Sequence, residues 1–267
     1  MINWVLQKNL TKPEILERIK SVLNGKDERW EEVEVIPFSS EIPELEHKDS
    51  FKIIYGSTTF MLNAYKNDEL KKGVFFEPIK FRMTNYVDKW KDKVLNSDGH
   101  LMKFGEIGNL KSNKEKKWFI RPNDDGKEFS GKVESFKELV NWSNKVCQLE
   151  LPELNKNTEV WISEPKEIKK EWRLFIVDNQ IVSVSRYMNN GELDESENDV
   201  PKGMIDFSKE VIHEYRLEDI YVMDIAEINS GYKLIECNCF NGTGFYKHDI
   251  EKIIQSVNKF VKRKIEK

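Results

Sequence analysis

The sequence feature that most constrains the fold is a predicted β-hairpin over residues 221–246, YVMDIAEINSGYKLIECNCFNGTGFY. Two apolar runs are separated by Asn-Ser-Gly at 229–231, which is a strong signal for a tight turn between antiparallel strands. With the turn centred on its serine, Asp224 lies opposite Glu236. Side chains alternate along a strand, so Glu236 and Asn238 share one face. The hairpin therefore predicts that two carboxylates and an amide converge on one patch.

The charges of this patch indicate its chemistry. Its same-face neighbours are expected to be apolar: Val222, Ala226, Leu234 and Phe240. Two close carboxylates in such surroundings repel each other and lose hydration, unless a proton or a cation compensates. The oxygen donors of Asp224, Glu236 and Asn238 suit Mg²⁺, which usually keeps water and phosphate oxygens as its other ligands. The alternative is that both carboxylates are edge residues paired with lysines.

The rest of the sequence predicts an α+β protein that begins with a small α/β unit. A Thr-Lys-Pro-Glu capping box at 11–14 and Gly25 bound a predicted helix. Short extended runs at 34–38, 51–55 and 74–76 alternate with helices. Such alternation is typical of a small α/β unit.

Longer strands follow, and hairpin connections between them predict antiparallel sheets with helices on one face. These strands are expected over 160–163, 171–177 and 181–187. The acidic stretch Gly191–Asp199 is expected to be an exposed loop. We therefore divide the chain into residues 1–90, a small α/β domain and candidate substrate-binding unit, and residues 91–267, a nucleotide-binding and catalytic domain.

A known family shares the pattern of the hairpin. An Asp on one strand, a Glu-x-Asn on the next and a small-residue loop at 241–244 resemble the metal-binding end of the ATP-grasp superfamily. The resemblance implies an ATP-grasp fold, with two α+β subdomains built on antiparallel sheets and preceded by a small α/β domain. It also implies that Asp224, Glu236 and Asn238 hold Mg²⁺ between ATP phosphates. No P-loop sequence is present.

Earlier segments resemble the other parts of such a nucleotide site, in the same order. ATP-grasp domains place a basic residue on a strand of the form hydrophobic-Lys/Arg-Pro, and Arg121 in Phe-Ile-Arg-Pro fits this form. Most members have lysine there, and arginine resembles a clade marked by two arginines and one lysine. The candidates for these three are Arg121, Arg173 and Lys127, with Arg186 competing for the second arginine. The loop 124–131 would be a flap over the triphosphate.

Four site assignments complete the prediction, and the first two of them follow from the same resemblance. The segment 160–165 looks like the hinge between the two subdomains, where Glu164 would meet adenine and ribose. Glu171 lies on a strand that resembles the Glu-containing strand of the family. Lys103 is a candidate phosphate or adenine contact, with a solvated lysine as an equal alternative. Arg186 is a candidate for contact with the transferred phosphoryl group, against a surface salt bridge.

Composition bears on the partners and the cellular compartment of the protein. The formal net charge is −4, and the basic residues are spread among acidic ones, which disfavours nucleic acid as a partner. Three cysteines form no disulfide framework, and the sequence shows neither a signal peptide nor an apolar run long enough to span a membrane. These features predict a cytoplasmic protein, and the sequence leaves its oligomeric state open.

The predicted function is ATP-dependent carboxylate–amine ligation with ATP and Mg²⁺ as cofactors. The γ-phosphoryl group would pass to a substrate carboxylate, and an amine would attack the acyl phosphate, with Arg173 and Arg186 neutralising phosphoryl charge. One alternative is a ligase that forms a lysine–AMP intermediate on Lys103, and another is a non-catalytic ATP sensor. The turn at 55–59 is a candidate substrate contact. The sequence does not identify the carboxylate, nor whether the amine belongs to an amino acid, a peptide or a protein.

Overall fold

The computed structural model describes residues 1–26, 28–36, 39–126, 128–149, 151 and 154–266. Its first sheet is parallel, with strand order β2-β1-β3. The elements of this part are β1 (Ile2–Gln7), α1 (Pro13–Asn24), β2 (Arg29–Val33), β3 (Phe51–Tyr55), α2 (Thr58–Tyr65), a 3₁₀ turn (Lys71–Gly73) and α3 (Met83–Trp90), followed by a 3₁₀ turn (Lys91–Lys93). The predicted small α/β unit is therefore present, although the boundary at residue 90 stays a prediction.

Three local predictions in this unit are wrong. The capping box does not form, because α1 begins at Pro13 with Lys12 at the N-cap and no side-chain cap. The second strand ends at Val33, where its pairing with β1 stops, so it precedes the predicted run. Residues 74–76 form no strand, since the Phe75 N–H donates to the Asn241 side chain (2.8 Å) and its ring packs in the core.

A four-stranded antiparallel sheet, order β4-β7-β5-β6, forms the middle of the chain. Its elements are β4 (His100–Lys103), a 3₁₀ segment (Phe104–Asn109), β5 (Lys117–Pro122), β6 (Lys132–Ser135), α4 (Phe136–Leu149) and β7 (Glu159–Ser163). Helix α4 and the 3₁₀ segment cover one face and enclose a separate core around Phe104, Ile120 and Ile162. The other face contributes to the cavity described below.

A five-stranded antiparallel sheet, order β10-β9-β8-β11-β12, forms the last part. Its elements are β8 (Lys170–Val177), β9 (Gln180–Asn189), β10 (Glu192–Ser196), α5 (Lys202–Glu214), β11 (Ile220–Ile228), β12 (Gly231–Cys239), a 3₁₀ turn (Phe240–Gly242) and α6 (Ile250–Ile265). The predicted α+β class with antiparallel sheets is confirmed. The acidic stretch 191–199 is not a loop throughout, because β10 pairs with β9.

The two faces of this sheet differ in what covers them. Trp172 and Leu174 of β8 and Met223 of β11 point into a core shared with α3 and α5. Phe175 and Val222, on the other face, pack in a core that includes α6 and the first strand. The rest of that second face carries polar side chains and lies over the middle sheet.

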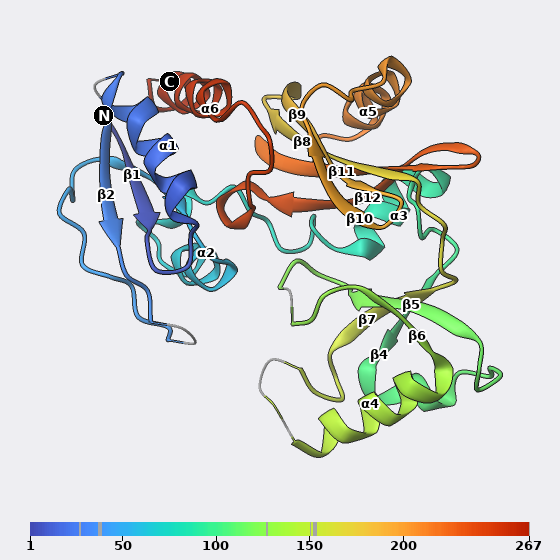
Figure 1. Cartoon of the computed structure of the whole chain (residues 1–267). Helices are drawn as coiled ribbons and strands as arrows, with labels where there is room; N and C mark the ends of the chain where they lie inside the picture. The colour runs from blue at the N-terminus through green and yellow to red at the C-terminus, as the bar shows by residue number, and fades with distance from the viewer. Residues whose placement is uncertain (27, 37–38, 127, 150, 152–153, 267) are drawn as a thin grey trace.

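Helix α6 returns to the beginning of the chain and packs beside α1 (Figure 1). Ile253, Val257 and Val261 lie in one core with Trp4 and Leu6 of β1. The Trp4 indole also donates to the Asn258 side chain of α6 (2.8 Å). The first sheet is therefore completed by the last helix.

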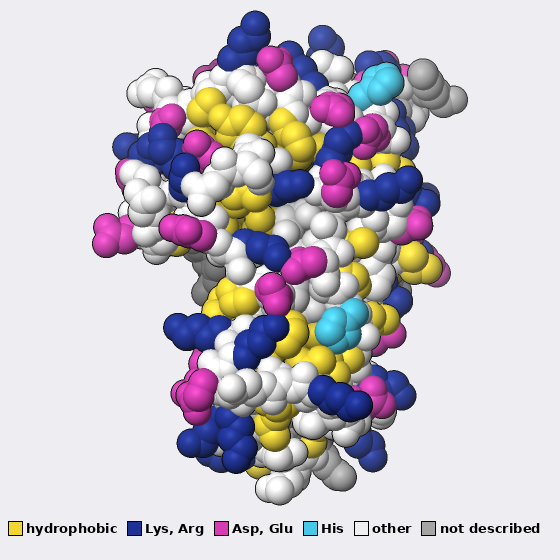
Figure 2. Space-filling model, turned by 90° about the vertical axis from the view of Figure 1, so that its right-hand side faces the viewer, with side chains coloured by type: hydrophobic (Ala, Val, Ile, Leu, Met, Phe, Trp, Pro, Cys, Tyr) yellow, Lys and Arg dark blue, Asp and Glu magenta, His cyan; other side chains and the backbone are white. Residues whose placement is uncertain are grey.

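The distribution of charge and the character of the helices can be compared with the predictions from composition. Figure 2 shows basic and acidic side chains interspersed over one face of the molecule, without a large region of one sign. Within the described ranges, none of the helices combines the length and the apolar character needed to cross a bilayer.

Candidate active site

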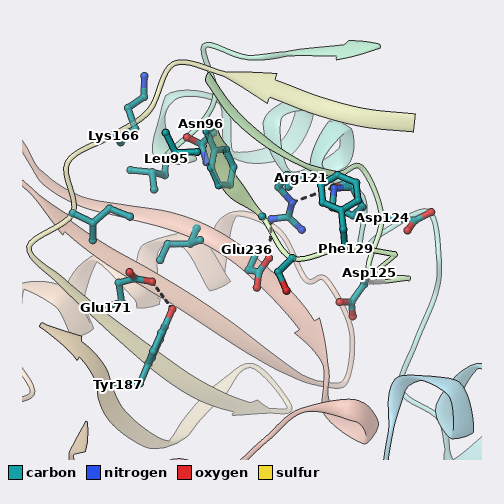
Figure 3. Close-up of a pocket in the computed structure, with 17 residues that line it drawn as sticks. Leu95, Asn96, Arg121, Asp124, Asp125, Phe129, Lys166, Glu171, Tyr187 and Glu236 are labelled. Atoms are coloured by element: carbon teal, nitrogen blue, oxygen red, sulfur yellow. Dashed lines mark hydrogen bonds and ion pairs between the residues drawn. The ribbon is translucent and has the colours of Figure 1, made fainter. Parts of the chain in front are cut away.

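A cavity of about 430 Å³ lies between the middle sheet and the polar face of the last sheet (Figure 3). Strand β5, the loop after it, the connection from β7 to β8, and strands β8, β9 and β12 all contribute to its walls. The residues that line it are Leu95, Asn96, Phe119, Arg121, Pro122, Asp124, Asp125, Phe129, Ser130, Gly131, Val133, Lys166, Ile168, Glu171, Tyr187, Ile235 and Glu236. Both predicted halves of a nucleotide site thus meet at one cavity.

The C-terminal hairpin places Asp224 directly opposite Glu236, as its sequence predicts. The route to this pairing differs from the expected one, because Ile228 pairs with Gly231 across a two-residue turn. That register alone would shift every pair by one residue, and an irregularity between Asp224 and Ile225 restores the expected pairing. Leu234 consequently turns to the opposite face and joins the core below α3, so its predicted place beside the carboxylates is wrong.

Asn238 lies between the two carboxylates. Its amide nitrogen is 3.1 Å from Glu236 Oε1 and 3.4 Å from Asp224 Oδ2. The structure therefore brings together the three side chains that the sequence predicts as metal ligands. Cys237 and Cys239 lie in the core on the other face, which agrees with the expectation that they take no part in the patch.

Arg173 is a charged partner of Asp224. Strand β8 pairs with β11 so that these two residues are direct neighbours. Arg173 Nε donates to Asp224 Oδ1 (2.9 Å) and Nη2 to Oδ2 (2.7 Å), a bidentate ion pair. Its third nitrogen, Nη1, donates to Thr243 Oγ1 (3.1 Å) and to the Gly244 carbonyl (3.4 Å). Burial lowers the Arg173 pKa, but the Asp224 carboxylate outweighs it and holds the pKa above the ordinary arginine value.

Two tyrosines that were not predicted from the sequence make cation–π contacts with the guanidinium of Arg173. The rings of Tyr187 and Tyr246 stack at 4.8 Å with an angle of 8° between their planes. The Arg173 guanidinium carbon lies 4.9 Å from the Tyr246 ring centre and 5.7 Å from that of Tyr187. Tyr246 comes from the loop after the hairpin, so no local pattern links it to β9.

Arg121 joins the two sheets across the cavity. Its neighbour Ile120 points into the core below β5, so Arg121 points to the cavity side. Arg121 Nη1 lies 2.8 Å from Glu236 Oε2, and its Nε donates to the Pro122 carbonyl (3.1 Å) (Figure 3). Burial lowers its pKa, but the Glu236 carboxylate and the other nearby acidic groups outweigh it and keep the pKa above its ordinary value.

Glu171 lines the cavity on β8, two residues before Arg173. It accepts a hydrogen bond from the Tyr187 hydroxyl (2.6 Å; Figure 3). Burial raises the pKa of Glu171, and the tyrosine hydrogen bond opposes that rise. The loop after β5 is tied to the hairpin by Asp125, whose Oδ2 accepts from the Cys239 N–H (3.0 Å), a contact that the sequence reading did not foresee.

The structure does not bring every predicted residue to this cavity. Arg186 lies on the face of the last sheet that carries Trp172, where it forms ion pairs with Asp194 and Asp199. The residue opposite it on β8 points away from Arg173, so Arg186 cannot share the Arg173 face. The structure therefore favours the alternative for Arg186, a salt bridge, over contact with a phosphoryl group.

Two other predicted contacts, Lys103 and Glu164, lie on the surface. Lys103 is exposed at the end of β4 and does not line the cavity. Glu164 is also exposed and pairs with Lys116 (2.8 Å), although the residues that follow it, Lys166 and Ile168, do line the cavity. Lys127 lies outside the described residues.

His248 is a buried histidine next to this region. It is 2% exposed, its Nδ1 lies 2.9 Å from Ser183 Oγ, and it meets the Phe175 ring edge-on at 4.7 Å. Burial, together with the charge of Arg173, lowers its pKa to about 3. The folded protein therefore keeps this imidazole neutral at pH values where it is protonated in the unfolded chain.

This difference predicts a loss of stability in acid. Between the unfolded pKa of about 6.5 and the folded value, only the unfolded state binds the proton. The contribution of His248 to the free energy of unfolding is fully present above pH 6.5. It falls by about 2 kcal/mol as the pH is lowered from 8 to 5. Urea unfolding at both pH values should show this extra loss in the wild-type protein and not in His248→Gln. Equal pH dependence in the two proteins would contradict it.

A sequence model matches residues 76–257, and it describes an ATP-grasp domain, family 3 of the clade marked by two arginines and one lysine. No curated protein sequence matches the chain significantly.

Solved structures with the same fold include a synthetase, a ligase and a macrocyclase. D-cycloserine synthetase DcsG has a TM-score of 0.65 at 9% identity, over 97% of this chain and 99% of that chain. D-alanine–D-alanine ligase from Bacillus anthracis has a TM-score of 0.61 at 12% identity, over 98% and 97%. Macrocyclase MdnC, bound with precursor peptide MdnA from Microcystis aeruginosa, has a TM-score of 0.60 at 12% identity, over 97% and 100%. At these identities the likeness concerns the fold.

Proposed function

The chain belongs to the ATP-grasp domain family numbered 3 in the clade with two arginines and one lysine, and from that premise we propose that it is an ATP-dependent carboxylate–amine ligase. The observation that carries the proposal is the meeting of Arg121 and Glu236 across the cavity, with Asp224, Asn238 and Arg173 directly behind them. A cavity lined by both apolar and charged side chains suits a nucleoside triphosphate.

ATP would lie along this cavity with its base against apolar side chains. Leu95, Phe119 and Ile235 offer apolar surface for an adenine ring. Glu171, held by the Tyr187 hydroxyl, is the acceptor available for a ribose hydroxyl. Arg121 and the described loop residues Asp124, Asp125 and 129–131 line the part of the cavity where the phosphates would lie. Backbone N–H groups of such a loop can bind phosphate oxygens.

The residues fit a magnesium ion beside Glu236. Glu236 lines the cavity, and the neighbouring Asp224 and Asn238 add further oxygen donors, the type that Mg²⁺ prefers. When bound, Mg²⁺ neutralises phosphate charge and polarises the transferred phosphoryl group. No other donor type is required, and the two buried thiols lie on the far face of the sheet.

The proposed reaction has two steps. A substrate carboxylate oxygen attacks the γ-phosphorus while the bond to the ADP oxygen breaks, which gives an acyl phosphate. A substrate amine then attacks the acyl carbon, the bond to phosphate breaks, and the nitrogen loses a proton as the amide forms. Arg121 would stabilise the phosphoryl oxygens, and Arg173 would hold Asp224 in place behind the cavity. The protein therefore acts by positioning and charge and supplies no nucleophile.

The carboxylate substrate would enter where the loop 241–244 meets the first domain. The Gly56 N–H donates to the Asn241 carbonyl (2.9 Å), and the Asn241 amide donates to the Ile54 (2.6 Å) and Gly73 (2.8 Å) carbonyls. This contact sets the turn at 55–59 beside Thr243, which is hydrogen bonded to Arg173. We assign the turn to substrate binding, and the substrate to the peptides and small molecules that carry a carboxylate.

The two alternative functions are less well supported. A lysine–AMP intermediate would need Lys103 at the cavity, but that residue is exposed outside its lining. A non-catalytic sensor would not need two carboxylates and two arginines arranged at the phosphate end. A covalent AMP adduct by intact mass would support the first alternative, and release of ADP would exclude it.

The first test is thermal unfolding with and without Mg²⁺ and the non-hydrolysable ATP analogue AMPPNP. A ligand at about 100 times its Kd stabilises the folded state by roughly 2.7 kcal/mol, or about 5 °C for a chain of this size. The expected rise requires both Mg²⁺ and the analogue. The absence of any rise at millimolar concentrations would remove the basis of the proposal, and a rise would justify a screen of carboxylates and amines for ADP release.

A further inference from the structure

The carboxylates assigned to Mg²⁺ already have arginine partners. Asp224 receives two hydrogen bonds from Arg173, and Glu236 is paired with Arg121. The repulsion between the carboxylates is therefore offset by two guanidinium groups of the protein itself. A divalent cation that approaches these oxygens must compete with an arginine and is repelled by its charge.

The two ion pairs are held very differently. Arg173 makes a bidentate pair, two further hydrogen bonds to the loop 241–244, and contacts to the stacked rings of Tyr187 and Tyr246. Arg121 has a contact of 2.8 Å to one oxygen of Glu236, and its Nε donates to the adjacent carbonyl of the chain. A network of planar, bidentate contacts is much harder to rearrange than a single pair.

The two ion pairs also differ in their access to the cavity. The Asp224 side chain is 2% exposed and does not line the cavity, and neither does Arg173. The Glu236 side chain is 29% exposed, and both Glu236 and Arg121 line the cavity. A nucleotide phosphate in the cavity would therefore contact Arg121. It would not contact Arg173 or Asp224, because neither residue lines the cavity.

We propose that Arg121 and a divalent cation exchange places on Glu236, and that they do so only when nucleotide phosphates are present to receive Arg121. This inference rests on the proposed function and deepens it. The phosphates offer Arg121 a new anionic partner, so Glu236 is released to the cation without loss of charge pairing. Arg173 stays on Asp224 throughout. The cation therefore enters as its nucleoside triphosphate complex, and the protein alone binds it poorly.

The exchange is tested with Mn²⁺ as the probe, by water proton relaxation, which separates free Mn²⁺, its nucleotide complex and the protein-bound ion. Titrations are made with and without AMPPNP on three proteins. Wild type should bind Mn²⁺ at least about tenfold more tightly with the analogue, the size expected for one charge-assisted hydrogen bond. Arg121→Met should gain about tenfold in Mn²⁺ affinity without the analogue, since the competing guanidinium is removed from Glu236.

Arg216→Met is the matched control, because it removes an arginine that pairs with Asp219 (2.6 Å) on the surface away from the cavity. It should behave as wild type. Adding Glu236→Gln to Arg121→Met should remove the gained affinity. Circular dichroism checks that each variant folds, and the wild-type titrations test the inference even if Arg121→Met does not.

Two results would overturn the exchange while leaving the proposed function intact. One is AMPPNP binding by a wild-type protein that takes up Mn²⁺ equally well without it. The other is a folded Arg121→Met protein whose Mn²⁺ affinity is unchanged. If AMPPNP binds to none of the proteins, the exchange and the proposed function fail together.

Discussion

Glu236→Gln is expected to reduce ATP turnover by at least about a thousandfold, equivalent to about 4 kcal/mol in the activation free energy. Glutamine has the shape of glutamate and can still accept a hydrogen bond from Arg121 and lie beside Asn238. It lacks the negative charge that would hold Mg²⁺ on the phosphates. The loss should therefore appear in the reaction and not in the fold.

The measurement is the rate of ADP release with whichever carboxylate and amine support turnover of the wild-type protein. Glu192→Gln is the matched control, because this glutamate is exposed on β10, at the opposite edge of the same sheet. It should leave the rate unchanged. Turnover of Glu236→Gln within a few-fold of wild type, with the thermal stability of both proteins equal, would show that Glu236 does not hold the metal.

The second large effect concerns stability. Arg173→Met is expected to lower the free energy of unfolding by about 3–5 kcal/mol, because it leaves the carboxylate of Asp224 buried without its bidentate arginine. Asp224 is 2% exposed, so water cannot replace the two hydrogen bonds that it loses. For a protein of this size the melting temperature should fall by about 5–9 °C.

A double variant separates the charge from the packing. Arg173→Met with Asp224→Leu removes both charges and keeps apolar volume, so it should recover most of the lost stability. Urea unfolding of the wild type, both single variants and the double variant gives the coupling energy of the pair. A loss below about 1 kcal/mol in Arg173→Met would mean that other groups compensate Asp224.

Much of the fold was predictable because its strands carry strong patterns. Strand β11 (Ile220–Ile228) is the first strand of the predicted hairpin. The alternation in β8 separates buried Trp172 and Leu174 from the face of Arg173. The α+β class and the ATP-grasp family are confirmed, and membership of that family favours the ligase over the two alternatives. The domain boundary and the roles of the site residues remain predictions.

The partners of the charged residues were less predictable. Asp224 pairs with Glu236 only because of a bulge, and no turn rule predicts that bulge. The predicted pairing was right, but the turn from which it was predicted was wrong. The pairing of Arg121 with Glu236 joins two sheets, and Arg186 is held on the other face by the acidic stretch that was expected to be a loop. Such choices depend on tertiary neighbours, which local patterns do not specify.

The return of α6 to the first sheet has a consequence for synthesis on the ribosome. Trp4 leaves the ribosome 254 residues before Asn258, the residue of α6 to which its indole donates. At elongation rates of about 5–20 residues per second, roughly ten seconds or more pass between synthesis of β1 and synthesis of α6. During this time the apolar side chains of β1 lack the α6 side chains against which they pack. During that interval the nascent sheet can be protected by α1 or by a chaperone, but its core closes only when translation has passed residue 265.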